Sequence, residues 1–132
     1  MSEHLMEHWI ESSDRNYDSM LNNYKSKDYN WALYIGHLVL EKLLKALFVK
    51  THTDNPQPPF THNLLKLAAL CELKTNDEIR RKLGEINTFN IEAKYEDDKK
   101  EFYKKCTKEY TDVHIKNIEE IRIWLKETLT QK

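Results

Sequence analysis

The hydrophobic residues of the chain recur every three or four positions, which is the spacing of one face of an α-helix. In the first such stretch, His4 to Lys25, the apolar side chains share one face while Glu7, Glu11 and Arg15 mostly face water. The next stretch, Tyr29 to Lys50, is the most apolar part of the chain, and its apolar residues cover nearly the whole helix circumference. A helix of this kind is predicted to be central, with other helices around it.

A loop and two shorter helical patterns follow. The segment Thr51–Thr61 holds all three prolines, and we interpret it as an ordered connection because proline cannot continue a helix. Thr61 is the expected N-cap of a third helix that ends near Glu72. The spacing of Thr75–Glu78 matches a capping box, which predicts a fourth helix that ends near Phe89.

The last third of the chain is more highly charged. We expect Asn90 to Asp97 to be a turn or an irregular connection, and the mixed charges of Asp98 to Glu109 are typical of a solvated helix face. The last helix is predicted to extend to about Leu129, with Val113 among its inward-facing residues. The pattern therefore predicts one all-α domain over residues 1–132, an antiparallel up-and-down bundle of four long helices plus one shorter helix.

Composition supports a helical domain and excludes several classes of protein. A chain of 132 residues has room for one domain, and 2 Gly and 3 Pro are too few for a β architecture with many tight turns. The net charge of −1 removes the basic surplus typical of a dedicated nucleic-acid binder. No apolar run approaches the roughly 18 residues that a membrane-spanning helix needs.

The N-terminal sequence and the cysteines indicate a cytoplasmic protein. The start MSEHLMEHW lacks the pattern of a secretory signal peptide. Cys71 and Cys106 are too few for a disulfide scaffold, so we expect both to be reduced thiols.

The sequence holds few motifs of known chemistry. With Gly36 and Gly84 as the only glycines, neither a phosphate-binding P-loop nor a dinucleotide fingerprint can be written. His4 to His8 fits the spacing of an inverted zinc-protease motif, but it lies at the start of the chain and no third ligand follows. We therefore expect no metal, no other cofactor and no catalytic cysteine.

One polar stripe on the central helix is the best candidate site that the residue pattern alone yields. His37, Glu41 and Lys45 follow one another at four-residue intervals on an otherwise apolar helix. Such a stripe has two interpretations. It can be an intrahelical ion pair on the one wet side of the helix, or it can line a ligand cleft between helices.

Five strings of residues together resemble a known family. In chain order they are Trp9…Asp14, Tyr29-x-x-Ala32, Glu41-Lys42-x-Leu44-Lys45-Ala46-Leu47, Pro58-x-x-Thr61-His62-x-Leu64 and Ile91-Glu92-Ala93-Lys94-Tyr95. Their order and spacing are similar to those of the HEPN domain (higher eukaryotes and prokaryotes nucleotide-binding), which itself resembles the C-terminal domain of kanamycin nucleotidyltransferase. The chain departs from the family at Lys94, where arginine is common, and at His37, where a small or amide residue is usual. The residues after Tyr95 also lack the usual proline.

The resemblance implies a helical bundle that is often a homodimer, and it implies one of two activities. Some members are metal-independent ribonucleases, often toxins, marked by an arginine followed four to six residues later by histidine. None of the arginines here has such a histidine: Arg15, Arg80, Arg81 and Arg122. His114 has only Lys108 at that distance, and lysine is a poor substitute for the planar guanidinium.

We therefore expect a non-catalytic module that binds a nucleotide or another substrate beside a nucleotidyltransferase. The alternatives are a toxin-like ribonuclease whose active site departs from the motif, with RNA as its ligand, and an interaction or scaffold domain without a ligand. A homodimer is also expected, because 3 Trp and 7 Tyr leave apolar surface to spare and aromatic residues are enriched at interfaces.

The family strings also suggest where a ligand would bind: Glu41, Lys45, His62, Lys94 and Tyr95. Lys45 and Lys94 would donate charge-assisted hydrogen bonds to phosphate, with Glu41 orienting Lys45. His62 would stand where the first N–H groups of a helix favour an anion, and Tyr95 would offer a face on which a base can stack.

Overall fold

The computed structural model describes residues 2–131, with only the backbone of Ser2 and Glu96. Within that range it contains six α-helices and no strand: α1 (Ser2–Lys25), α2 (Tyr29–Thr51), α3 (Leu64–Leu70), α4 (Asp77–Glu92), α5 (Glu96–Lys105) and α6 (Lys108–Thr130). The all-α prediction is confirmed. The predicted number of helices was wrong, because the charged segment after α4 forms a helix of its own.

Helix α2 is the centre of the molecule, as its pattern predicted. It packs against each of the other five helices, and its leucines Leu43, Leu44 and Leu47 are buried. At Gly36 the neighbouring helices come especially close. A Cβ atom there would lie 2.5 Å from Ile118 Cδ1 of α6 and 3.1 Å from Met20 Sδ of α1. Glycine at this position therefore lets α1 and α6 pack on the same stretch of α2.

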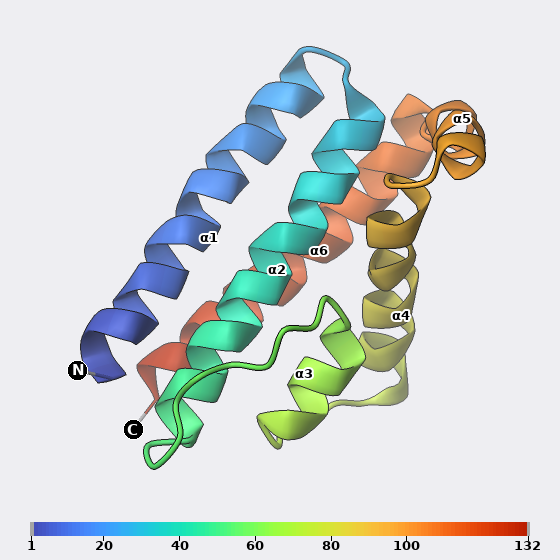
Figure 1. Cartoon of the computed structure of the whole chain (residues 1–132). Helices are drawn as coiled ribbons and strands as arrows, with labels where there is room; N and C mark the ends of the chain where they lie inside the picture. Colours follow the sequence, from blue (N-terminus) through green and yellow to red (C-terminus); the bar gives the residue numbers. More distant parts are fainter. Residues whose placement is uncertain (1, 132) are drawn as a thin grey trace.

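Successive long helices run in opposite directions. In Figure 1, α1 rises from the N-terminus, α2 descends beside it, α4 rises and α6 descends. Helices α2 and α6, which pack against each other, consequently run in the same direction. The chain termini lie near each other at the lower left of Figure 1.

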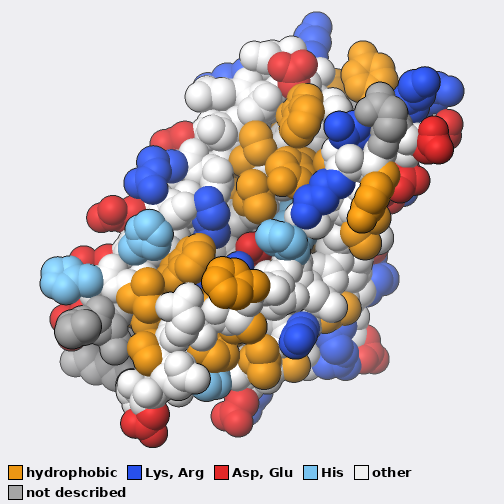
Figure 2. All heavy atoms as spheres, in the orientation of Figure 1, with side chains coloured by type: hydrophobic (Ala, Val, Ile, Leu, Met, Phe, Trp, Pro, Cys, Tyr) orange, Lys and Arg blue, Asp and Glu red, His pale blue; other side chains and the backbone are white. Residues whose placement is uncertain are grey.

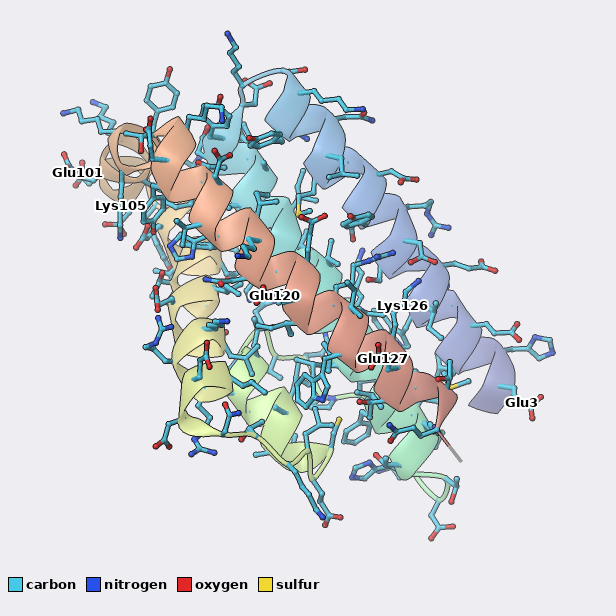
Figure 3. The ribbon with its side chains drawn as sticks, turned by 180° about the vertical axis from the view of Figure 1, so that it is seen from behind. Glu3, Glu101, Lys105, Glu120, Lys126 and Glu127 are labelled. Atoms are coloured by element: carbon cyan, nitrogen blue, oxygen red, sulfur yellow. The ribbon has the colours of Figure 1, made fainter. Side chains whose placement is uncertain are left out.

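Polar contacts as well as apolar packing fix α1. The buried hydroxyl of Ser13 donates a hydrogen bond of 2.8 Å to the carbonyl of Val39 in α2. Toward α6, the hydroxyl of Tyr17 donates to Glu119 Oε2 at 2.6 Å, and Arg122 lies over the Tyr17 ring. Figure 3 shows this rear side of the molecule, where Glu120 and Glu127 project from α6.

The starts of α3 and α4 differ by one or two residues from the sequence prediction. Asn63, not Thr61, caps α3, because its side chain accepts hydrogen bonds from the N–H groups of Leu65 and Lys66. Asn76, not Thr75, caps α4 in the same way. In both cases asparagine takes the cap ahead of a neighbouring threonine, in agreement with its stronger cap preference.

The end of α4 and the charged segment also correct the prediction. Helix α4 continues past Phe89 to Glu92, because Phe89 and Asn90 are both buried. Helix α5 then places Phe102 in the core, while its charged residues from Asp97 onward are exposed. It ends before Thr107, whose side chain caps α6. With α6 beginning at Lys108, Val113 faces outward and is 58% exposed, whereas the sequence predicted that it faces inward.

Two further expectations concern the thiols and the membrane. Cys71 and Cys106 are both free thiols in the core. Among residues 2–131, no helix combines the length and the apolar character that a bilayer crossing requires.

Candidate ligand-binding site

The carboxylate of Glu41 is the centre of a buried polar cluster on α2. Its side chain is only 5% exposed, and it has partners on both oxygens. Lys45 Nζ donates to Oε2 at 3.0 Å, and His62 Nδ1 lies 2.8 Å from Oε1. His37 Nδ1 lies 3.7 Å from the same Oε1. The polar stripe of α2 therefore meets the loop that precedes α3.

The loop between α2 and α3 brings His62 to this cluster. In Figure 1 this loop, residues 52–63, crosses in front of α2 before α3 begins. It is held there by the ring of His37, whose Nε2 lies 2.8 Å from the carbonyl oxygen of His62 and donates to it. Burial lowers the pKa of His37, although the nearby Glu41 carboxylate opposes this shift. A neutral His37 with its proton on Nε2 fits both observations.

Lys45 faces inward rather than toward solvent. Lys45 is buried, and its ammonium lies 5.4 Å from the centre of the Trp9 ring of α1. A cation over an aromatic face is stabilised by the ring quadrupole. Lys45 therefore balances the charge of Glu41 and holds the carboxylate in place. This is the intrahelical ion pair of the first interpretation of the stripe, although it is buried and not on a wet side of the helix. His62 is the exposed member of the cluster, with 55% of its side chain open to solvent.

Lys94 and Tyr95 are the two predicted residues that lie outside this cluster. Both are exposed and stand in the turn between α4 and α5. The charge of Lys94 is close enough to contribute to lowering the pKa of His37. Neither residue makes a hydrogen bond to Glu41, Lys45 or His62 within the described part of the chain. The structure thus brings three of the five predicted residues into direct contact, places the charge of Lys94 near His37, and shows no contact between Tyr95 and the cluster.

One argument for an anion at His62 fails. The first N–H groups of α3 are already occupied, because Asn63 accepts from Leu65 and Lys66 and Asn87 Oδ1 accepts from Leu64 at 2.8 Å. The start of α3 therefore offers no free donors to a phosphate, and an anion would have to be held by side chains.

A pocket that the sequence did not predict lies beside the cluster. It has a volume of about 360 Å³ and lies between α3 and α4. Its lining consists of His62, Asn63, Leu65, Gly84, Asn87, Thr88, Asn90 and Ile91. Amides that recur three residues apart on the inner side of α4, Asn87 and Asn90, were the signal in the sequence that could have revealed it. Figure 2 shows this side of the molecule, where His, Lys and Arg side chains stand among hydrophobic ones.

The other candidate catalytic residues, a ribonuclease-like pair and the two cysteines, do not form a catalytic arrangement in the described structure. His114 is buried against the rings of Phe89 and Tyr110, while the ammonium of Lys108 pairs with Asp112. The two residues therefore do not form a ribonuclease-like pair. Burial raises the pKa of the Cys71 thiol and of the Cys106 thiol to about 12, so neither is a nucleophile at neutral pH.

The inverted zinc-protease motif at the N-terminus has no third metal-binding side chain among the described residues. His4 and His8 are exposed on the first turns of α1. Between residues 2 and 131 no three His, Cys, Asp or Glu side chains come together as a metal site.

Comparison with known proteins agrees with the resemblance seen in the sequence. The family model of the HEPN domain matches residues 6–128, from the second turn of α1 to near the end of α6, and this range includes all the residues of the cluster. No curated protein matches the chain, and no solved structure matches it. Because the family model covers nearly the whole chain, the protein belongs to the HEPN domain family.

Proposed function

We propose that this HEPN domain binds a nucleotide or a similar phosphate-bearing ligand at His62, Lys94 and Tyr95, and that it acts beside a nucleotidyltransferase encoded elsewhere. The partner follows from the resemblance of the family to the C-terminal domain of kanamycin nucleotidyltransferase. The observation that carries the binding site is the buried Glu41 carboxylate, which fixes an exposed histidine ring by a 2.8 Å contact.

The five residues divide into two roles. Glu41 and Lys45 are positioning residues, because both are buried and their charges are paired with each other. Lys94 is exposed, so it can donate a charge-assisted hydrogen bond to a phosphate. His62 can do the same through Nε2–H when both of its ring nitrogens carry protons, while Nδ1–H stays on Glu41. Tyr95, the next residue after Lys94 in the chain, offers an exposed aromatic face. No separate observation favours a ribonuclease.

The test is a calorimetric titration of the purified chain with ATP and GTP. The unmutated protein should bind at millimolar or lower nucleotide concentration. His62→Ala and Lys94→Ala should each weaken binding about tenfold, since a hydrogen bond to a charged group contributes about 1.5–3 kcal/mol. The melting temperature of Lys94→Ala should hardly change, because its side chain makes no ion pair in the described structure.

A matched control removes a lysine from another face. Lys116 is exposed on α6, so Lys116→Ala should leave nucleotide affinity unchanged while altering net charge as Lys94→Ala does. Absence of heat with either nucleotide would refute the proposal, and so would equal losses in the two lysine variants. Cleavage of RNA by the purified chain would instead support the ribonuclease alternative.

A further inference from the structure

The pocket between α3 and α4 has the size and lining of a small-molecule subsite. Its volume of about 360 Å³ falls within the range of about 300–1,000 Å³ typical of ligand pockets. Leu65 and Ile91 are exposed hydrophobic residues in its lining. His62 belongs both to this lining and to the Glu41 cluster, so the pocket is continuous with the proposed phosphate-binding residues.

The second glycine of the chain lies in this pocket and has no structural explanation. Gly36 is required by close helix packing. At Gly84, by contrast, a Cβ atom would meet only Leu65 Cδ1, at an ordinary contact distance of 3.9 Å, and the backbone φ is not positive. Glycine inside a helix is less stable than alanine. Its one evident consequence here is to keep the pocket open.

The pocket also contains a buried polar group without a partner. Asn90 is only 6% exposed, and its Nδ2 atom makes no hydrogen bond to any described residue. Asn87, one turn earlier, is fully engaged because its Oδ1 accepts from Leu64 and its Nδ2 donates to Asn63. An unsatisfied buried donor is unfavourable. Because Nδ2 is shielded from solvent, the Asn90 amide has to turn before this atom can donate to an acceptor atom of a ligand in the pocket.

We propose that this pocket receives the base of the nucleotide, a planar ring with hydrogen-bond acceptors on its edge. Apolar contact with Leu65 and Ile91 covers the ring, and Asn90 Nδ2 donates to its edge. The inference rests on the proposed function, because the phosphates of the same ligand lie on the side of the pocket that His62 shares with the Glu41 cluster.

The test compares a nucleotide with its phosphate part alone. ATP, UTP and inorganic tripolyphosphate are titrated into the unmutated chain, into Gly84→Leu, which fills the pocket, and into Asn90→Ala. The unmutated chain should bind ATP at least tenfold more tightly than tripolyphosphate. Gly84→Leu should reduce the affinity for ATP to that for tripolyphosphate, and Asn90→Ala should weaken ATP binding several-fold while tripolyphosphate binding persists.

Two further variants keep the result interpretable. Thr88→Trp fills the same pocket from an exposed position on its rim, so it serves if Gly84→Leu fails to fold. Ala69→Leu adds the same side chain at an exposed position of α3 that is not part of the pocket, and it should leave ATP binding unchanged.

The outcomes separate this inference from the proposed function. If ATP and tripolyphosphate bind the unmutated chain equally, or if the pocket-filling variants bind ATP normally, the base does not occupy this pocket while the phosphate site stands. A loss of the preference for ATP in Tyr95→Ala but not in Gly84→Leu would place the base on Tyr95 and overturn the inference. Absence of binding by all three ligands would refute the proposed function itself.

Discussion

Glu41 shows how strongly a single residue of this site depends on its partners. The carboxylate is almost withdrawn from water, which is unfavourable for a charged group unless the charge is paired and hydrogen-bonded. Lys45 supplies the opposite charge and His62 a second donor. Such a buried pair is weak evidence for high stability, because its desolvation offsets its attraction, but loss of one partner is costly.

Removal of the positive charge alone should destabilise the protein. Lys45→Met keeps the apolar stem over Trp9 but leaves Glu41 without its ammonium partner, so we expect the free energy of unfolding to fall by about 3 kcal/mol. The double variant Glu41→Gln/Lys45→Met should recover most of that loss. Urea denaturation of the two variants and of the unmutated protein measures both values. A single variant within about 0.5 kcal/mol of the unmutated protein would contradict the role given to Lys45.

Two buried histidines should make the fold sensitive to acid. Burial lowers the pKa of His37 and of His114 in the folded state, so the unfolded chain binds more protons as the pH falls. Stability is therefore fully present above about pH 6.5, the ordinary value for histidine, and decreases as the pH falls below it. Melting temperatures at pH 7.5 and 5.5 should show this loss.

Substitution of one buried and one exposed histidine tests whether histidine burial causes the loss of stability at low pH. His114→Phe should reduce the loss between these pH values, because a phenyl ring packs against Phe89 and Tyr110 without titrating. The exposed His4 provides the control, and His4→Gln should behave as the unmutated protein does. An identical pH profile in His114→Phe would be evidence against this explanation.

At the scale of elements, the sequence predicted the helices whose burial is regular and missed those whose signal is mixed. Helix α2 was placed within one residue of its observed bounds because apolar residues surround it. The sequence assigned Asp98 to Glu109 to a solvated helix face but did not separate α5 as a helix of its own, because one buried ring, Phe102, anchors ten residues that are otherwise largely charged. Within the site, the α2 stripe followed from helical spacing. The approach of His62 to Glu41 depends on the path of a proline-containing loop and did not follow from spacing.

The anchoring of α5 can be tested by comparing two adjacent aromatic residues. Phe102 is buried against Phe89, whereas Tyr103 is exposed. Phe102→Ala should lower the free energy of unfolding by about 3–5 kcal/mol, and Tyr103→Ala should change it by less than about 1 kcal/mol. Hydrogen exchange should become faster in α5 and in the turn at Lys94 before it does so in α2. Equal effects of the two substitutions would show that α5 is not anchored in this way.

At the scale of the whole molecule, exposed aromatic side chains are carried by two segments at the same end of the bundle, the start of α2 and α5. Trp31 and Tyr103 are both exposed, and the start of α2 and α5, which carry them, lie toward the upper end of the molecule in Figure 1. Exposed apolar surface of this kind is typical of an interface.

We expect this surface to join two copies of the chain. Light scattering at tens of micromolar protein should give about twice the mass of one chain, and Trp31→Glu should shift the mass toward that of one chain because a charge would be buried at the interface. Lys116→Glu, at an exposed position of α6, is the control. The mass of a single chain for the unmutated protein would rule out the dimer.

We propose above that a phosphate-bearing nucleotide binds beside the Glu41 cluster. Nuclear magnetic resonance can detect this binding residue by residue. Amide and histidine resonances of the labelled chain are followed while ATP is added. Binding at the proposed site should cause saturable shifts at His62, Asn90, Lys94 and Tyr95. The resonances of exposed α6 residues such as Glu120 and Glu127, which lie on the rear face in Figure 3, should change little. Saturable shifts confined to another face, or no shifts at millimolar ATP, would contradict the proposal.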